Sequence, residues 1–308
     1  MSVWHQRWGL YLWQMYQPIS RLLFCLLTTL GIAMALPRMH QDITVISGRF
    51  GLAVISLMLI LLYYRLCDEF KDLETDRLHF PDRPVPSGKV LIQDLNTMKQ
   101  LASILGLLLN VIWPQGLLAY LALYAFAWGM GKWFFLPNLI ANNRLLAFVT
   151  HSPISLFGSF YVFTLFLPAG ADLFDARHIL LALWFALPGF AWEIARKTRA
   201  PEHEEPGYQI YSTLLGYRGA AILAPIFALL QLAVFYSLAH QLALPNWFEG
   251  TLIGLSIFYC LPFALFIKQP LVYESWLKTA SELYTVLLLI LFPLAMSAQT
   301  IRWQLQLF

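Results

Sequence analysis

The sequence predicts an all-α membrane protein of about nine transmembrane helices, folded as one bundle with a central cavity. Hydrophobic residues make up 59% of the 308 residues and charged residues only 12%, about half the charged share of a soluble domain. Apolar runs recur at roughly the 20 residues that a helix needs to cross a hydrocarbon core. No low-complexity tract or soluble appendage interrupts them, so we expect a single domain over 1–308.

The predicted crossings are the nine longest apolar runs. They lie near 20–37, 46–66, 98–114, 116–137, 145–169, 177–196, 218–241, 248–268 and 280–300.

The positive charges support this count. With the N-terminus inside, the cytoplasmic loops are 66–97, 137–144, 197–217 and 268–279. Of 20 Lys and Arg residues, four then fall on the outer side: Arg38, Arg49, Arg177 and Arg302. The positive-inside rule predicts such an asymmetry, which an extra or missing helix would scramble. We expect a multi-pass protein of a bacterial inner membrane, with two long, charged loops, 67–97 and 197–217, in the cytoplasm.

Three aspartates recur at four-residue intervals where the second apolar run ends: Asp68, Asp72 and Asp76. Residues four apart on a helix share a face, so the carboxylates would point one way and repel each other. Mg²⁺ takes oxygen ligands and commonly bridges one or two carboxylates to substrate phosphates. A metal–diphosphate site is one interpretation of this cluster, and a solvated helix cap is the other.

The segment 82–88, Asp-Arg-Pro-Val-Pro-Ser-Gly, favours the diphosphate site. Two prolines fix the backbone and Gly88 permits a turn, so Arg83 would be held near the carboxylates. A fixed guanidinium beside metal-binding acids suits a diphosphate, whose charge both kinds of cation would neutralise. The position at the mouth of a membrane helix predicts that the rest of the substrate is lipophilic.

A second charged segment spans 193–208. Four acidic and three basic side chains share it: Glu193, Glu202, Glu204, Glu205, Arg196, Lys197 and Arg199. Glu193 lies inside the last apolar turn, where an ionisable group is costly and usually functional. A surface loop with offsetting charges is the alternative interpretation.

These motifs resemble those of the UbiA superfamily of intramembrane prenyltransferases. That family has nine helices and an NDxxDxxxD motif followed by RPxPSG, to which 68–76 and 83–88 correspond. Its second acidic motif follows the sixth helix, as 193–205 does here, although the family uses aspartates. Thr150-His151-Ser152-Pro153 is similar to a Thr-His-x-Pro turn of ubiquinone-type members. The Lys-Arg pair that often precedes this turn is replaced by Ala147-Phe148, with Arg144 as the candidate substitute.

The resemblance implies Mg²⁺-dependent transfer of a prenyl group from an isoprenoid diphosphate to an aromatic or other lipophilic acceptor within the membrane. Its partners would be these two substrates and the lipid bilayer, without nucleic acid. The implied catalytic residues are Asp68, Asp72, Asp76 and Arg83. The implied metal ligands are Asp68, Glu69, Asp72, Asp76, Glu193 and Glu202. The candidate phosphate-binding residues are Lys71, Arg77, Arg144, Arg196 and Lys197.

Two other functions remain open from the sequence. A terpene cyclase would keep the fold and the metal but capture the carbocation within the same prenyl chain. A non-catalytic carrier fits less well, because transport sites usually lie near the midplane of the bilayer. His79 and His151 could act as bases, but a hydrogen-bonded structural role is the expectation for both.

Overall fold

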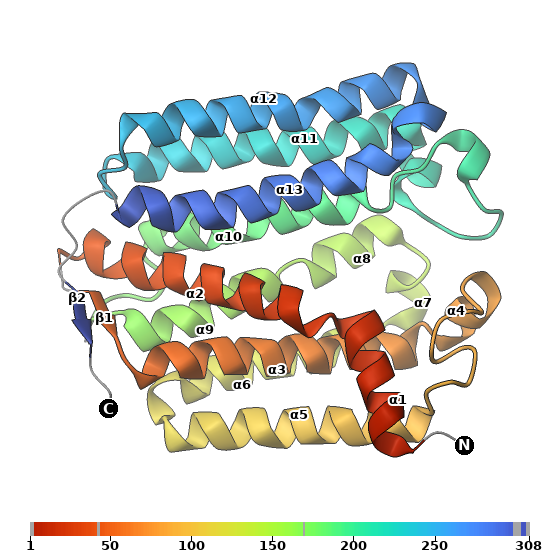
Figure 1. The fold of residues 1–308 in the computed structure, drawn as a ribbon, viewed down its shortest axis with the longest axis horizontal. Helices are drawn as coiled ribbons and strands as arrows, with labels where there is room; N and C mark the ends of the chain where they lie inside the picture. Colours follow the sequence, from red (N-terminus) through yellow and green to blue (C-terminus); the bar gives the residue numbers. More distant parts are fainter. Residues whose placement is uncertain (1–2, 42–43, 169, 298–302, 306–308) are drawn as a thin grey trace.

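The computed structural model describes residues 3–41, 44–168, 170–297 and 303–305. Within them the chain is helical apart from turns and one pair of short parallel strands, β1 (Thr44–Ile46) and β2 (Trp303–Leu305). The strand pair joins the segment after the first crossing to the segment after the last. Both segments therefore lie at one end of the bundle (Figure 1).

Long helices run side by side through the bundle (Figure 1). They are α2 (Pro18–Met39), α3 (Gly48–Lys71), α5 (Ile92–Ile112), α6 (Leu117–Met130), α8 (Arg144–His151) with α9 (Ile154–Phe166), α10 (Ala176–Ala195), α11 (Tyr211–Ala239), α12 (Asn246–Lys268) and α13 (Pro270–Ser297). Shorter segments connect them: α1 (Trp4–Tyr11), η1 (Leu12–Tyr16), α4 (Leu73–His79), η2 (Pro114–Gly116), η3 (Trp133–Phe135), α7 (Pro137–Ile140) and η4 (Pro201–His203).

The predicted all-α membrane fold is confirmed. In the described part of the chain, eight helical segments are long and apolar enough to cross a membrane, with α8 and α9 together forming one of them. The predicted crossing 116–137 corresponds to α6, which has only 14 residues. The protein is an integral, multi-pass membrane protein.

Two predicted boundaries differ from the structure for local reasons. The crossing expected at 145–169 is divided after His151, because Pro153 lacks the N–H that a continuous helix needs. The loop expected at 268–279 is mostly helical, since α13 begins at Pro270 and only Gln269 separates it from α12. Proline is favoured at the first position of a helix, which explains the early start.

Helix α2 lies between two groups of helices. It contacts α3 and α9 on one side and α10 and α13 on the other. Gly31 permits this close approach, because a Cβ there would lie 2.8 Å from the Phe185 ring of α10 and 3.2 Å from Phe292 of α13. A larger residue at this position would require these rings to move.

The two ends of the bundle differ in charge and structure. One end carries α1, α4, α7 and the connection between α10 and α11, and the other carries the strand pair (Figure 1). Arg38, Arg49 and Arg177 lie at or beside helix termini at the strand end, as the predicted topology requires. Arg302, the fourth predicted outer residue, lies outside the described residues.

A polar network joins three helices inside the bundle. The amide nitrogen of Asn110 donates to Ser56 Oγ and Gly106 O at 2.9 Å each, and its Oδ1 accepts from the Tyr161 hydroxyl at 2.9 Å. Asn110 is fully buried. Within a bilayer such groups have no water to bind, so each must find a partner in the protein.

Asn110→Ala should lower the free energy of unfolding by about 1–2 kcal/mol, because it leaves the Ser56 and Tyr161 hydroxyls without this partner. Reversible unfolding in mixed micelles measures the change. Asn142→Ala is the matched control, since Asn142 is exposed and contacts only a carbonyl of its own turn. Equal stability of the two variants would contradict the role of the network.

Candidate functional site

The candidate site is formed by the ends of helices α3 and α10, which lie at the same end of the bundle (Figure 1). The first acidic segment continues from α3 through Asp72 into α4. Backbone hydrogen bonds from Asp72 N to Asp68 O and from Asp76 N to Asp72 O, both 2.8 Å, carry the helical path across the junction. The spacing of the three aspartates thus remains close to that of one helix.

The three aspartates have different surroundings. Asp68 pairs with Lys71 at 2.7 Å, and Asp76 is buried against Arg83. Among the described residues, the Asp72 carboxylate makes no hydrogen bond or ion pair. Burial raises the pKa of Asp72, and the neighbouring carboxylates of Asp68 and Asp76 raise it further, whereas Lys71 and Lys197 lower it. A cation at Asp72 would relieve this repulsion.

The loop at 82–88 holds Arg83 in place, as its prolines predicted. Val85 is buried, Ser87 N donates to Arg83 O at 3.0 Å, and Gly88 adopts φ +73°, a conformation that favours glycine. Arg83 Nη1 donates to both carboxylate oxygens of Asp76, at 2.9 and 2.8 Å. Its guanidinium also lies 3.8 Å from the centre of the Phe80 ring.

Glu69 is buried and pairs within its own helix. Its side chain is 1% exposed and pairs with Arg65 at 2.5 Å. The nearby α1 is fixed to the start of α5 by the Arg7–Asp94 pair, at 2.6 Å. Glu69 therefore belongs to the packing between α3 and the N-terminal helix.

The second segment begins with a three-residue ion cluster. Glu193, on the last turn of α10, accepts from Arg196 and Lys197 at 2.6 Å each. Burial lowers the pKa of Lys197 to about 8; Glu193 opposes this, while the charges of Arg196 and Arg144 add to it. Several positive charges therefore lie close together, and their combined electric field favours the binding of an anion.

The two charged segments touch each other. His79 Nδ1 lies 2.8 Å from Glu205 Oε2, and the His79 ring packs on Tyr208 with centroids 4.9 Å apart. Phe80 packs edge-on against the same tyrosine at 5.8 Å. These contacts link the segment that follows α3 to the segment that follows α10.

A third segment, η3, lies against the end of α3. Gly131 approaches Cys67 so closely that a Cβ would be 2.9 Å from it. The next residues, Trp133, Phe134 and Phe135, have φ of 52°, 49° and 62°. This left-handed conformation costs a non-glycine residue about 1–2 kcal/mol. The turn places the Trp133 ring 4.3 Å from Lys71 Nζ.

Other predicted residues lie at the edge of this site or beyond it. Arg144 Nε donates to Gln209 O at 3.1 Å, which fixes α8 to the second segment. Arg77 is exposed and pairs with Glu74 of its own helix. Glu202 is exposed on η4, and among the described residues its side chain makes no hydrogen bond or ion pair with the rest of the site.

Among the described residues, no three His, Cys, Asp or Glu side chains form a group that could hold a metal ion by themselves. Mg²⁺ does not require such a group, because it commonly binds one or two carboxylates together with substrate phosphates and water. The oxygen donors of Asp68, Asp72 and Glu193 have the right chemistry for that arrangement. The residues therefore fit a metal that arrives with a diphosphate.

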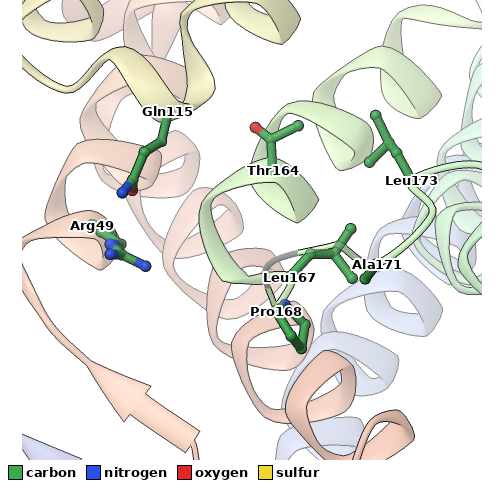
Figure 2. Close-up of a pocket in the computed structure, with 7 residues that line it drawn as sticks. All are labelled: Arg49, Gln115, Thr164, Leu167, Pro168, Ala171 and Leu173. Carbon is green, nitrogen blue, oxygen red and sulfur yellow. The ribbon is translucent and has the colours of Figure 1, made fainter.

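A separate pocket of about 430 Å³ lies at the strand end of the bundle. Figure 2 shows its lining, in which Arg49 and Gln115 face a wall of aliphatic side chains that includes Leu167. None of the predicted site residues contributes to it. It is distinct from the site between α3 and α10.

Sequence reasoning missed Trp133 and Tyr208. The motif at 68–76 has a recognisable spacing, whereas both aromatic residues occur among many others in an aromatic-rich chain. The left-handed turn has no sequence signal, since it uses three aromatic residues where glycine or asparagine is expected.

Tyr208→Ala should increase amide hydrogen exchange in 203–209 about tenfold, because the ring contacts with His79 and Phe80 are lost and an aromatic pair contributes about 1 kcal/mol. Exchange followed by mass spectrometry measures this. Tyr236→Ala, at the other end of α11, should leave that segment unchanged. Unchanged exchange in both variants would show that the two charged segments do not hold each other.

No protein-family model matches the sequence, and no curated protein does either. Among solved structures, the chain is similar to that of digeranylgeranylglyceryl phosphate synthase, a UbiA-superfamily prenyltransferase. The TM-score is 0.61 with 17% identity, over 96% of this chain and 100% of that chain. At this identity the similarity concerns the fold. The UbiA-like fold predicted from the motifs is thereby confirmed.

Proposed function

We propose that the protein transfers a prenyl group from an isoprenoid diphosphate to a lipophilic acceptor, with Mg²⁺ as cofactor. One observation carries the proposal: in a UbiA-like fold, the ends of α3 and α10 bring carboxylates and buried cations together at one end of a membrane bundle. A diphosphate needs both, since metal and basic side chains share its charge. Its prenyl tail would lie among the apolar helices.

We assign the metal to Asp68, Asp72, Asp76 and Glu193. Glu69 is left out because its carboxylate is buried against Arg65, and Glu202 because it is exposed on η4. Bound there, Mg²⁺ would supply charge neutralisation of the diphosphate leaving group.

The cations of the site now neutralise the acids that we assign to the metal. Lys71 pairs with Asp68, and Arg196 and Lys197 pair with Glu193. When metal and diphosphate bind together, these carboxylates would turn to the metal and the three cations to the phosphate oxygens. Each of these five paired charges would keep an opposite partner in both states, which avoids leaving it uncompensated near the membrane core.

The chain would promote the reaction by stabilising the departing diphosphate. The bond between the allylic carbon and oxygen breaks with its electron pair going to the diphosphate, while Lys71, Arg196 and Lys197 donate hydrogen bonds to the oxygens that gain charge. Arg83 holds the Asp76 carboxylate in position. The face of Trp133, beside Lys71, borders the same space and can stabilise positive charge.

Asp72→Asn should abolish metal-dependent release of diphosphate, with a loss of at least about 100-fold, because the uncharged amide is a poor Mg²⁺ ligand. Release is measured with a coupled phosphate assay in nanodiscs. Asp82→Asn is the matched control, since Asp82 is exposed in the neighbouring loop. Equal activity of the two variants would rule out this site.

Arg83→Lys should raise KM for the prenyl diphosphate and lower kcat/KM about tenfold or more. Lysine keeps the charge but loses the planar contact with Phe80 and the fixed contact with both Asp76 oxygens. Steady-state kinetics test this, with the exposed Arg218→Lys as control. Wild-type kinetics in Arg83→Lys would show that a positive charge at this position is sufficient and that the guanidinium contacts are not needed.

Product analysis tests the function itself. The purified protein is incubated with Mg²⁺, farnesyl or geranylgeranyl diphosphate and membrane lipid extract, and products are identified by mass spectrometry. A prenylated acceptor supports the proposal. A cyclised hydrocarbon formed without extract would identify a terpene cyclase. A failure to release any diphosphate would favour the third function, a non-catalytic carrier.

A further inference from the structure

His151 is a half-buried histidine at the end of α8, and the reaction proposed above assigns it no role. Its imidazole lies in an aromatic recess formed by the left-handed turn, with ring centroids 5.2 Å from Trp133 and 5.8 Å from Phe134. Trp133 also contacts Lys71, so the imidazole and the ammonium lie against the same indole ring. The charges of Lys71, Asp68 and Lys197 act on the imidazole as well. His151 therefore borders the proposed diphosphate site.

The hydrogen bonds around His151 determine which nitrogen carries the proton. Thr150 Oγ1 is 2.7 Å from Leu146 O and 3.2 Å from Ala147 O, and carbonyl oxygens only accept. The single hydroxyl proton is thus directed to the carbonyls of its own helix, as is common for threonine in membrane helices. Thr150 Oγ1 is also 3.0 Å from His151 Nδ1. Since the threonine has no second proton to give, Nδ1 must be the donor.

The other nitrogen, Nε2, then carries a lone pair. It is buried and has no hydrogen-bond partner in the described structure. A buried acceptor without a donor is unfavourable and calls for an explanation such as a ligand. A hydroxyl group that enters the recess would donate to Nε2 and remove this cost. A carbon nucleophile without a hydroxyl group has no such proton to donate.

We propose that His151 is the catalytic base that takes the proton from a hydroxyl group of the acceptor. The inference rests on the prenyl-transfer function proposed above and specifies its acceptor. The acceptor oxygen forms a bond to the allylic carbon as the carbon–oxygen bond to the diphosphate breaks. The hydroxyl proton passes to Nε2, which gives an imidazolium, and the diphosphate leaves with the electron pair. Later loss of that proton to water restores the neutral histidine.

The aromatic recess explains which hydroxyl compounds could enter. Trp133 and Phe134 line the imidazole, and Phe134 packs on Phe126, which stacks on Phe157 at 4.5 Å. These side chains give the recess an apolar wall on the membrane side. A lipophilic alcohol or phenol fits this combination of an apolar wall and one hydrogen-bond acceptor.

The test compares His151→Asn with the wild type in nanodiscs, with Mg²⁺, geranylgeranyl diphosphate and membrane lipid extract. Asparagine keeps a donor near the Nδ1 position for Thr150 but has no lone pair in place of Nε2. We expect kcat for transfer to fall about 100-fold or more, as for loss of a general base, with KM for the diphosphate unchanged. His240→Asn, an exposed histidine at the other end, is the matched control.

Two further measurements separate a base from a structural residue. Free imidazole should restore part of the activity of His151→Ala, because it can replace the missing base but not a missing contact. The wild-type product should carry its prenyl group on oxygen, which does not depend on how any variant folds. Transfer within about threefold of wild type in His151→Asn, no rescue by imidazole, or a carbon-linked product would each overturn the inference. A wild type that forms no prenylated product would instead overturn the proposed function.

Discussion

The site depends on the pairing of charges at the ends of membrane helices. An ionised group near the hydrocarbon core is stable only with an opposite charge or hydrogen bonds nearby, because its own desolvation costs several kcal/mol. Glu193 meets this condition through Arg196 and Lys197, three and four residues later on the same helical path. Asp68 meets it through Lys71, three residues away. Each of these acids is therefore paired within its own helix end.

Local pairing leaves the site able to exchange partners. The Asp68–Lys71 pair lies at the end of α3, and the pairs of Glu193 lie at the end of α10. Because none of these pairs joins the two helices, breaking them does not separate α3 from α10. The connection between the two segments comes instead from His79, Glu205 and Tyr208. The bundle beneath is fixed by close contacts such as that of Gly31 with Phe185. A ligand could thus rearrange the charges while the helices stay in place.

The sequence predicted the parts of this protein that depend on local patterns. The lengths of the apolar runs predicted the membrane helices. The distribution of Lys and Arg predicted that the charged loops lie at one end of the bundle. The four-residue spacing and two prolines placed Arg83 near the aspartates, where it pairs with Asp76. Which charged side chains pair with each other could not be predicted from the sequence. Glu69 lies one residue outside the four-residue spacing of the aspartates, and its burial against Arg65 was not predicted.

The aromatic turn shows most clearly why the rest could not be predicted. Three consecutive left-handed residues, Trp133 to Phe135, contradict the local preferences of the chain. Such a conformation persists only where the surrounding structure fixes it, and it is concentrated at functional sites. Here the close packing of Gly131 on Cys67 fixes the turn against α3.

The departures from the UbiA pattern lie in two different places. Glu193, where that family uses aspartates, is on the last turn of α10, at the same end of the bundle as the matching segments 68–76 and 83–88. Ala147-Phe148, in place of a basic pair, lies on α8 one turn before His151. Under the function proposed above, these apolar side chains would suit an uncharged acceptor.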